Sequence, residues 1–91
     1  MRYTINFSDD AKEIVRIYKK FNPIAYKKLS KLLVEISEHP REGTGHPKPL
    51  IGGKDVTYSR RISGKDRIVY DIYDDIVVVL IVSVGGHYKD K

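Results

Sequence analysis

The sequence contains no cysteine and no apolar run long enough to cross a bilayer, and we expect no secretion signal. Without cysteine the fold has neither a disulfide nor a thiolate metal site, as is common in reducing compartments. The first residues, MRYTINFSDD, do not follow the basic, apolar and small-residue order of a signal peptide. The longest apolar run, IVVVLIVSV at 76–84, is far too short for a membrane helix. We therefore expect a cytoplasmic protein that makes no membrane contact.

The chain of 91 residues is enough for one small domain, which we place at residues 1–91. Seventeen Lys and Arg residues against 12 Asp and Glu residues give a net charge of +5. An excess of positive charge suits a polyanionic partner such as RNA, DNA, anionic lipid or an acidic protein. Many ordinary soluble domains are equally basic, so the charge by itself leaves the class of partner open.

The N-terminal half predicts one strand followed by two helices. Tyr3–Phe7 alternates apolar and polar residues and is rich in strand formers. Ser8 is a suitable N-cap for a first helix that extends to about Phe21. Asn22 and the proline after it restart a helical pattern, which ends at His39. Because so little chain joins the two helices, we expect them to pack as an antiparallel hairpin.

The C-terminal half predicts a long loop and three strands. The segment HPREGTGHPKPLIGGKD, residues 39–55, is dense in proline and glycine, and we expect an ordered, functional loop. Strands are predicted at 56–62, 67–73 and 76–84, separated by the turn sequences SGKD and DD. The last of them is apolar almost throughout, as expected of a strand that is covered on both faces.

This order of elements predicts an α+β fold, β-α-α-β-β-β, without repeats or a second domain. Its two-helix hairpin should pack on one face of a twisted, mostly antiparallel sheet. The strands at 56–62 and 67–73 carry three arginines around one turn, Arg60, Arg61 and Arg67. Strand alternation places Arg60 on the face of Tyr58, opposite Arg61, so the two neighbours cannot both face solvent. One of them should extend along the sheet edge or pair with a carboxylate.

Arg61 and Arg67 can meet on the open face of the sheet, where guanidinium groups bind phosphate in a bidentate manner. The alternative is that the arginines serve solubility and pair with Asp71 or Asp74. The helical lysines have the same two explanations, a solvated surface or a contact surface for nucleic acid. These lysines are Lys19, Lys20, Lys27, Lys28 and Lys31.

The three histidines, His39, His46 and His87, lack metal-ligand spacing and have no carboxylate cluster beside them. We therefore predict no metal site and no cofactor. His87 and Tyr88 form a pair near the C-terminus. An imidazole titrates near neutral pH, and a phenol can stack on a base, so this pair is a candidate for acid–base chemistry on RNA.

Together, the motifs REGTGHPKPL at 41–50, YSRRISGKDRIVY at 58–70 and HY at 87–88 resemble the YoeB/Txe family of bacterial toxins. These toxins are mRNA interferases of toxin–antitoxin systems within the RelE superfamily. The resemblance covers essentially the whole chain and is strongest from Pro40 to Asp75. It implies a RelE-like, microbial-ribonuclease-like fold.

The resemblance also implies an endoribonuclease that cleaves mRNA in the ribosomal A site without metal and so inhibits translation. The 2′-hydroxyl would attack the adjacent phosphate, leaving a cyclic phosphate and a free 5′-hydroxyl. A cognate antitoxin would be the protein partner, the ribosome and mRNA would be the other partners, and a homodimer is left open.

Four residues match family positions with known roles. Arg67 would steady the phosphate, Arg61 would be a second basic residue, His87 the general acid and Tyr88 the residue that positions RNA. Two departures affect the last pair. The hairpin before it is slightly longer here, and KDK follows it, whereas the family pair ends the chain.

Lys48 stands where the family has a glutamate general base, since this sequence reads HPKPL instead of the family's PEPL pattern. A lysine accepts a proton only when burial or neighbouring cations lower its pKa. Distant RelE-type relatives use lysine and arginine in place of a carboxylate, so we predict Lys48 as a catalytic residue. Glu42 and Asp66 are alternative bases. Arg60 and Lys65 are predicted, with Arg61, to bind RNA phosphate.

Two other functions stay open. The domain could bind RNA or an antitoxin without catalysis, as an inactive toxin-like module that uses the same basic hairpin. It could also be a protein-interaction domain whose basic face binds an acidic partner. Codon-phased 5′ ends in mRNA after induction would distinguish an enzyme from both.

Overall fold

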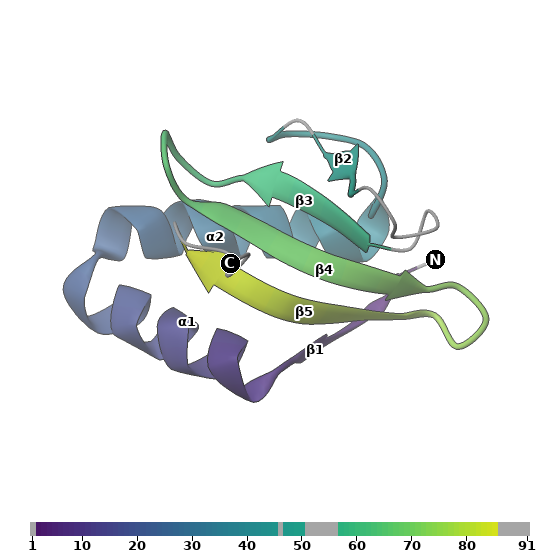
Figure 1. The fold of residues 1–91 in the computed structure, drawn as a ribbon, viewed down its shortest axis with the longest axis horizontal. Coiled ribbons are helices and arrows are strands. Elements are labelled where there is room, and N and C mark those ends of the chain that lie inside the picture. Colours follow the sequence, from purple (N-terminus) through teal and green to yellow (C-terminus); the bar gives the residue numbers. More distant parts are fainter. Residues whose placement is uncertain (1, 46, 51–56, 86–91) are drawn as a thin grey trace.

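Two helices cover one face of a five-stranded sheet (Figure 1). The computed structural model describes residues 2–45, 47–50 and 57–85. The elements are β1 (Thr4–Phe7), α1 (Asp9–Phe21), α2 (Pro23–Glu38), β2 (Lys48–Pro49), β3 (Thr57–Arg61), β4 (Arg67–Tyr73) and β5 (Val78–Gly85). The strand order is β1-β5-β4-β3-β2, with β1 parallel to β5 and the other neighbours antiparallel. The predicted fold class is confirmed.

Side-chain caps begin both helices where the sequence predicts them. The Ser8 hydroxyl accepts a hydrogen bond from the Ala11 amide at 3.1 Å, and the Asn22 side chain accepts one from Ala25 at 3.3 Å. Asn22 also ends α1, because its own amide donates to the Tyr18 carbonyl at 2.8 Å. One residue thus closes one helix and opens the next, which produces the predicted antiparallel hairpin.

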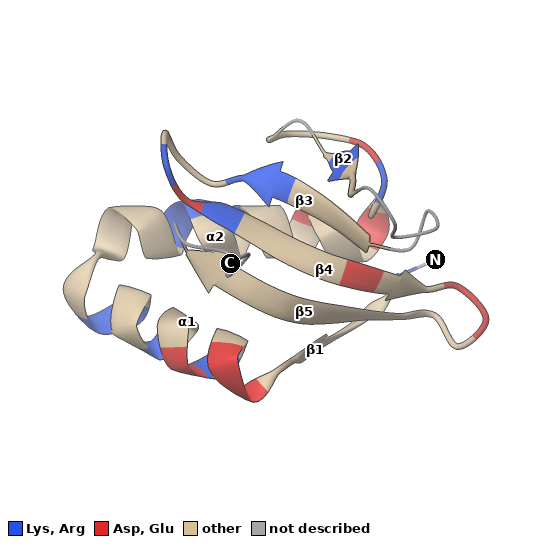
Figure 2. Ribbon diagram, in the orientation of Figure 1, with Lys and Arg blue, Asp and Glu red and all other residues tan. Residues whose placement is uncertain are grey.

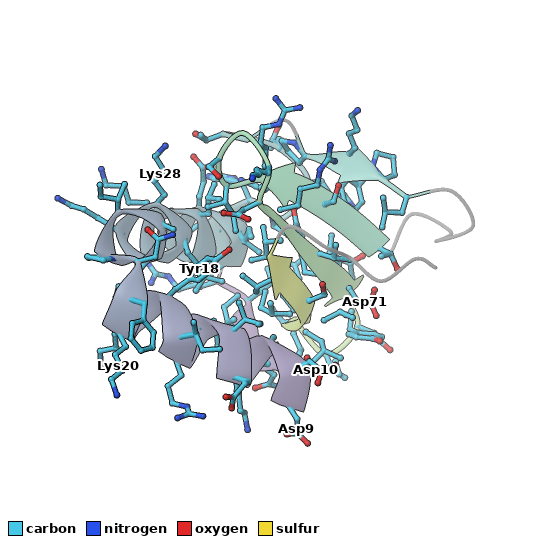
Figure 3. All side chains as sticks on the ribbon, turned by 60° about the vertical axis from the view of Figure 1, so that its left-hand side comes forward. Asp9, Asp10, Tyr18, Lys20, Lys28 and Asp71 are labelled. Carbon is cyan, nitrogen blue, oxygen red and sulfur yellow. The ribbon has the colours of Figure 1, made fainter. Side chains whose placement is uncertain are left out.

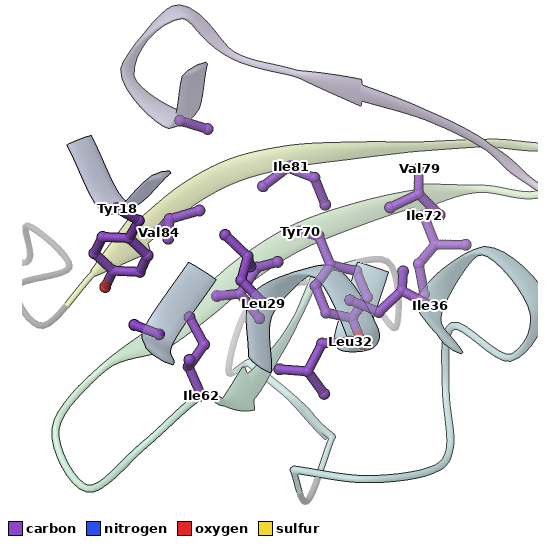
Figure 4. Close-up of a cluster of buried hydrophobic side chains, with 13 residues drawn as sticks. Tyr18, Leu29, Leu32, Ile36, Ile62, Tyr70, Ile72, Val79, Ile81 and Val84 are labelled. Carbon is purple, nitrogen blue, oxygen red and sulfur yellow. The ribbon is translucent and has the colours of Figure 1, made fainter. Parts of the chain in front are cut away.

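The hydrophobic core lies between this helix hairpin and the inner face of the sheet (Figure 4). Helix α2 contributes Leu29, Leu32 and Ile36, all nearly inaccessible. They pack against the inward-facing residues of the two central strands, which are Ile68, Tyr70, Ile72, Val79, Ile81 and Val84. Each fully buried aliphatic side chain contributes about 1.5–3 kcal/mol relative to an exposed one. The core therefore holds β4 and β5 against α2, and β3 is joined to β4 by pairing along its five residues.

The third predicted strand, 76–84, differs from the observed β5 in its start and in its burial. Ile76 and Val77 belong to the turn after β4, and Val77 has a positive φ of 53°. Along β5, buried residues alternate with half-buried ones such as Leu80. The prediction that this strand is covered on both faces is therefore wrong, since the helices cover its inner face.

The predicted loop 39–55 contains one further strand. Lys48 and Pro49 form β2, which pairs antiparallel with Ser59 and Tyr58 of β3. The Leu50 amide extends this ladder by donating to the Thr57 carbonyl at 2.9 Å. The order of elements thus gains one short strand. The structure describes residues 39–45 and 47–50 of the predicted loop, and residues 46 and 51–55 lie outside the described part. Within the described residues, neither helix is both long and apolar enough to pass through a bilayer.

Candidate active site

Two arginines face each other across the outer surface of the sheet. Arg61 of β3 is paired in register with Arg67 of β4, and both side chains are exposed. Side chains directly opposite in an antiparallel pair have Cβ atoms about 4.5–5.5 Å apart, and like charges there are destabilising. A fold that keeps two guanidinium groups in this arrangement is poised to bind an anion between them.

A cleft of about 190 Å³ opens at this arginine pair. Its lining residues are Gly45, Lys48, Ser59, Arg61 and Arg67, and we call it the cleft from here on. Lys48 reaches it because β2 places this residue opposite Ser59, which lies on the same face of β3 as Arg61. Figure 2 shows basic residues at the end of β3, at the start of β4 and on β2, and acidic residues in the turn between β4 and β5.

Arg60 has a different role from the one predicted. Its side chain is completely buried on the inner face of the sheet. All five of its N–H groups are used: they donate to the Tyr70 hydroxyl (2.9 Å), to a Glu35 carboxylate oxygen (2.8 Å), and to the carbonyls of Thr44 (3.2 Å), His39 (2.6 Å) and Glu42 (2.7 Å). The prediction that Arg60 binds RNA phosphate is therefore wrong, whereas the expectation that one of the two neighbours pairs with a carboxylate is confirmed.

Arg60 fastens the segment 39–45 onto β3 and α2. Glu35 of α2 completes this anchor, because its carboxylate also accepts hydrogen bonds from the Thr44 amide at 2.8 Å and the Thr44 hydroxyl at 3.2 Å. Burial alone would raise the pKa of Glu35, but the bonds from Thr44 and Arg60 outweigh burial and hold this pKa below its ordinary value. The anchored segment leads directly to Gly45 and Lys48 in the cleft.

Two glycines let this segment approach its anchors closely. Gly43 has a φ of 121°, and a Cβ there would lie 2.8 Å from the Glu35 carboxylate. Gly45 has a φ of 86°, and a Cβ there would lie 2.8 Å from the Arg61 carbonyl oxygen. The Gly45 carbonyl in turn accepts a hydrogen bond from the Arg61 amide at 2.8 Å. The motif EGTG is therefore a structural requirement of the cleft wall.

A second anchor ties the same segment to the far end of the sheet. Arg41 donates to both carboxylate oxygens of Asp74, at 3.2 and 2.9 Å, and the Tyr3 hydroxyl donates to Asp74 at 2.6 Å. The Arg41 guanidinium also lies 5.9 Å from the ring centre of Tyr58. Asp74 therefore pairs with Arg41, and not with one of the hairpin arginines as one alternative had it.

Three other predicted residues lie apart from the cleft as it is lined by the described residues. Lys65 is exposed in the turn between β3 and β4, and Glu42 is exposed in the segment 39–45. Asp66 accepts a hydrogen bond from the Ser63 hydroxyl at 3.3 Å and faces Tyr18. Burial, followed by the charge of Asp66, raises the pKa of Tyr18 to about 12. These positions do not favour Glu42 or Asp66 as the general base.

His46, His87 and Tyr88 lie outside the described residues. Strand β5 ends at Gly85, which is paired with Arg67. His87 and Tyr88 are the second and third residues after Gly85 in the sequence. Among the residues that the structure does describe, no three His, Cys, Asp or Glu side chains gather as a metal ion would require.

Two cleft residues escaped the sequence analysis. Ser59 is buried and lines the cleft. Strand alternation places Ser59 on the same face as Arg61, and this pattern could have identified it. Gly45 was visible as part of a glycine-rich segment, but its contact with Arg61 joins positions far apart in the chain. Glu35, which anchors the loop, gives no local signal, because its partners Thr44 and Arg60 lie far from it in the sequence.

Comparison with known proteins identifies close relatives. The family model described as "YoeB-like toxin of bacterial type II toxin-antitoxin system" matches residues 7–88. A protein called Toxin YoeB from Mycobacterium bovis is 34% identical over 77 residues, which are 85% of this chain and 91% of the relative. The mRNA interferase toxin RelE of Escherichia coli strain K12 is 32% identical over 91 residues, which are 100% of this chain and 90% of the relative.

Solved structures agree with the sequence matches. The YoeB dimer from Staphylococcus aureus superimposes with a TM-score of 0.83 at 32% identity, covering 97% of this chain and 100% of the other. The YoeB–YefM complex from the same organism gives a TM-score of 0.81 at 34% identity, with the same coverage. The fold and the arrangement of the strands that form the cleft are therefore shared with these toxins.

Proposed function

The chain belongs to the YoeB-like toxins of bacterial type II toxin–antitoxin systems, and on that premise we propose that it is an mRNA-cleaving endoribonuclease whose active site is the cleft. The observation that carries the proposal is the meeting of Lys48, Arg61 and Arg67 in that one cleft. The two arginines are a like-charge pair across two strands, which costs stability unless an anion occupies the space between them.

The proposed chemistry begins with a phosphate of mRNA held between the two guanidinium groups. Attack by the neighbouring 2′-oxygen forms the new P–O bond, and negative charge builds on the non-bridging oxygens. Fixed cations aimed at those oxygens lower the barrier, and removing one such group typically costs about 10²–10³ in rate. Because the core holds β4, and β3 is held by its pairing with β4 and by the bond from Arg60 to Glu35, Arg61 and Arg67 are positioned before the substrate arrives.

Two proton transfers complete the reaction. Lys48 takes the proton of the 2′-hydroxyl, and His87 donates a proton to the 5′-oxygen as the P–O5′ bond breaks. The products are a 2′,3′-cyclic phosphate and a 5′-hydroxyl. Tyr88 positions the RNA. The placement of Lys48 in the cleft supports its part, and the short sequence distance from Gly85, which is paired with Arg67, supports the part of the His87–Tyr88 pair.

We propose that the reaction needs no metal ion, because the guanidinium groups of Arg61 and Arg67 already stand where charge develops. Cleavage of ribosome-bound mRNA should proceed at the same rate in excess EDTA when ribosomes are kept intact by polyamines. A loss of cleavage that returns on adding a divalent cation to the purified toxin, and not to the ribosomes, would contradict this.

Mapping of mRNA 5′ ends after induction tests the proposed activity. The wild type should produce new 5′-hydroxyl ends in phase with codons, and Arg67→Ala should abolish them. Arg16→Ala is the matched control, since Arg16 is an exposed arginine of α1 paired with Glu13. Absence of new ends with the wild type would favour a binding module without catalysis.

The general acid and base have their own tests. His87→Gln should slow single-turnover cleavage on ribosomes, and an unchanged rate would remove His87 as the acid. Lys48→Glu keeps a proton acceptor at the same place, so cleavage should continue. Complete loss of cleavage in Lys48→Glu would show that the positive charge of Lys48 is what the cleft requires.

The partners follow from the relatives. We propose that a small antitoxin of the YefM type neutralises this toxin, that the toxin acts in the ribosomal A site, and that it can form a dimer. The staphylococcal YoeB has been solved both as a dimer and with YefM. Coexpression of the reading frame adjacent to the toxin gene should restore growth, and continued growth arrest would argue against an encoded antitoxin there.

A further inference from the structure

A second and larger cavity, of about 370 Å³, lies next to the cleft, between α2 and the end of β3. We call it the α2 groove. Lys28 and Lys31 of α2 form one wall, Leu32 and Ile62 the apolar part, and Thr44 and Arg61 the border towards the cleft. Arg61 lines both cavities, and Thr44 is followed in the chain by Gly45, which lines the cleft. The two cavities therefore meet at Arg61, with the cleft on the outer face of the sheet and the α2 groove on the helix side.

The charged groups of the α2 groove leave it positive. Lys28, Lys31 and Arg61 are all exposed, and Figure 3 shows Lys28 projecting from α2 away from α1. Glu35 also lines the groove, but its carboxylate is 2.8 Å from the buried Arg60 guanidinium and accepts two hydrogen bonds from Thr44. The Glu35 charge is thus balanced locally, and the lysines and Arg61 set the sign of the groove.

We propose that the α2 groove is a second RNA subsite, which holds the nucleotide next to the one whose phosphate occupies the cleft. This inference rests on the proposed function, because it extends the same RNA strand past Arg61. The two lysines contact the phosphates on either side of that nucleotide, and its base lies on Leu32 and Ile62. A cavity of 370 Å³ is within the range of about 300–1,000 Å³ that small-molecule sites occupy.

Charge and continuity favour a single RNA strand over an acidic protein segment as the occupant. An RNA strand offers phosphates at regular spacing with a flat base between them, which matches cations on the wall and border of an apolar recess. Such a strand must also continue beyond the cleft in both directions, and the groove shares Arg61 with the cleft. An acidic protein segment would also neutralise the lysines, but its chemistry does not require contact with Arg61, which lines both cavities.

The test compares two double variants with equal change in net charge. Lys28→Glu with Lys31→Glu alters the groove, and Lys12→Glu with Lys19→Glu alters exposed positions of α1. Circular dichroism confirms that each variant folds. Binding is measured by fluorescence anisotropy with a labelled single-stranded 2′-O-methyl RNA, which cannot be cleaved, and with a 2′-O-methyl dinucleotide that fills the cleft alone.

Relative to the α1 control, the groove variant should bind the longer RNA about ten-fold more weakly. Its salt slope should fall by about 1.4, or about 0.7 for each phosphate that is no longer neutralised by a lysine. The dinucleotide should bind both variants equally. Equal affinity and slope for the longer RNA would overturn the subsite, as would failure of the wild type to bind that RNA at low salt. Codon-phased cleavage by the wild type would still support the proposed function.

A third outcome would assign the groove differently. If the groove variant loses affinity for the coexpressed antitoxin while its RNA binding equals that of the α1 control, the α2 groove binds an acidic protein segment and the RNA subsite is refuted.

Discussion

Replacing Arg60 by leucine should destabilise this toxin strongly, whereas the same change at its neighbour Arg61 should not. The two residues are adjacent in β3, yet one is fully buried with every donor used and the other is exposed in the cleft. The two variants therefore distinguish the structural role of Arg60 from the phosphate-binding role that we propose for Arg61.

The loss of stability in Arg60→Leu comes from the buried groups that no longer have a hydrogen-bond partner. Removing one partner of a buried ion pair typically costs about 3–5 kcal/mol, because the remaining groups stay desolvated. Here Glu35 keeps its bonds from Thr44, and its side chain is 33% exposed, so water partly replaces the guanidinium. We therefore expect the lower end, about 3 kcal/mol. Small domains have a total stability of about 5–15 kcal/mol, so this loss is a large fraction.

Replacing Arg61 by leucine should have a different effect on stability. Leucine there removes a like charge directly opposite Arg67. Relief of such a pair is worth about 0.2–1 kcal/mol, so the variant should be slightly more stable than the wild type. Its cleavage rate should nevertheless fall by about 100-fold, since one phosphate-binding cation is lost.

Thermal unfolding followed by circular dichroism measures both variants. For a chain of this size, about 3 kcal/mol corresponds to a fall in Tm of about 12–24 °C. Arg60→Leu should show this fall, and Arg61→Leu should keep or slightly raise its Tm. Equal Tm values for the two variants, or a larger fall for Arg61→Leu, would refute the assignment of their roles.

Three smaller perturbations test the loop and the β4–β5 turn. Gly45→Ala should lower the free energy of unfolding in urea by about 1–2 kcal/mol. The reason is that Gly45 has a positive φ and that a Cβ there would lie 2.8 Å from the Arg61 carbonyl oxygen. An unchanged urea midpoint would contradict this close approach. Val77→Asn should raise the free energy of unfolding by about 1 kcal/mol, since asparagine tolerates the φ of 53° better than a β-branched residue does. A Tm lower than that of the wild type would contradict this. The pKa of Glu35 in the folded state lies below its ordinary value of 4.5, so its contribution to stability is present above that pH and is lost as the pH falls through the folded value. Glu35→Gln should therefore lose less stability than the wild type when urea unfolding is compared at pH 5 and pH 3, and parallel losses would count against the Glu35 anchor.

Local patterns in the sequence predicted most of the fold. The caps Ser8 and Asn22 act within three residues of their partners, and the apolar spacing of α2 repeats over its whole length, so both helices follow from neighbouring residues. Strand β2 was missed because its two residues form a strand through pairing with β3. That pairing depends on how the loop 39–50 folds back, which local composition does not encode.

The basic residues that line the cleft were predicted more fully than the groups that anchor them. Arg61, Arg67 and Lys48 were named from the motifs and do line the cleft. Arg60 was misassigned because arginine is seldom buried, although strand alternation had already placed it on the face opposite Arg61. Its burial becomes possible through a carboxylate from α2 and three loop carbonyls, and no local pattern brings those groups together.

The central claim is that the guanidinium groups of Arg61 and Arg67 hold the reacting phosphate. Its most direct test is the single-turnover rate of cleavage of ribosome-bound mRNA by purified wild type and Arg67→Ala, with the Tm of each variant measured in the same buffer. The account predicts a fall in rate of about 10²–10³ with an unchanged or slightly raised Tm. Equal rates from two equally folded proteins would contradict it.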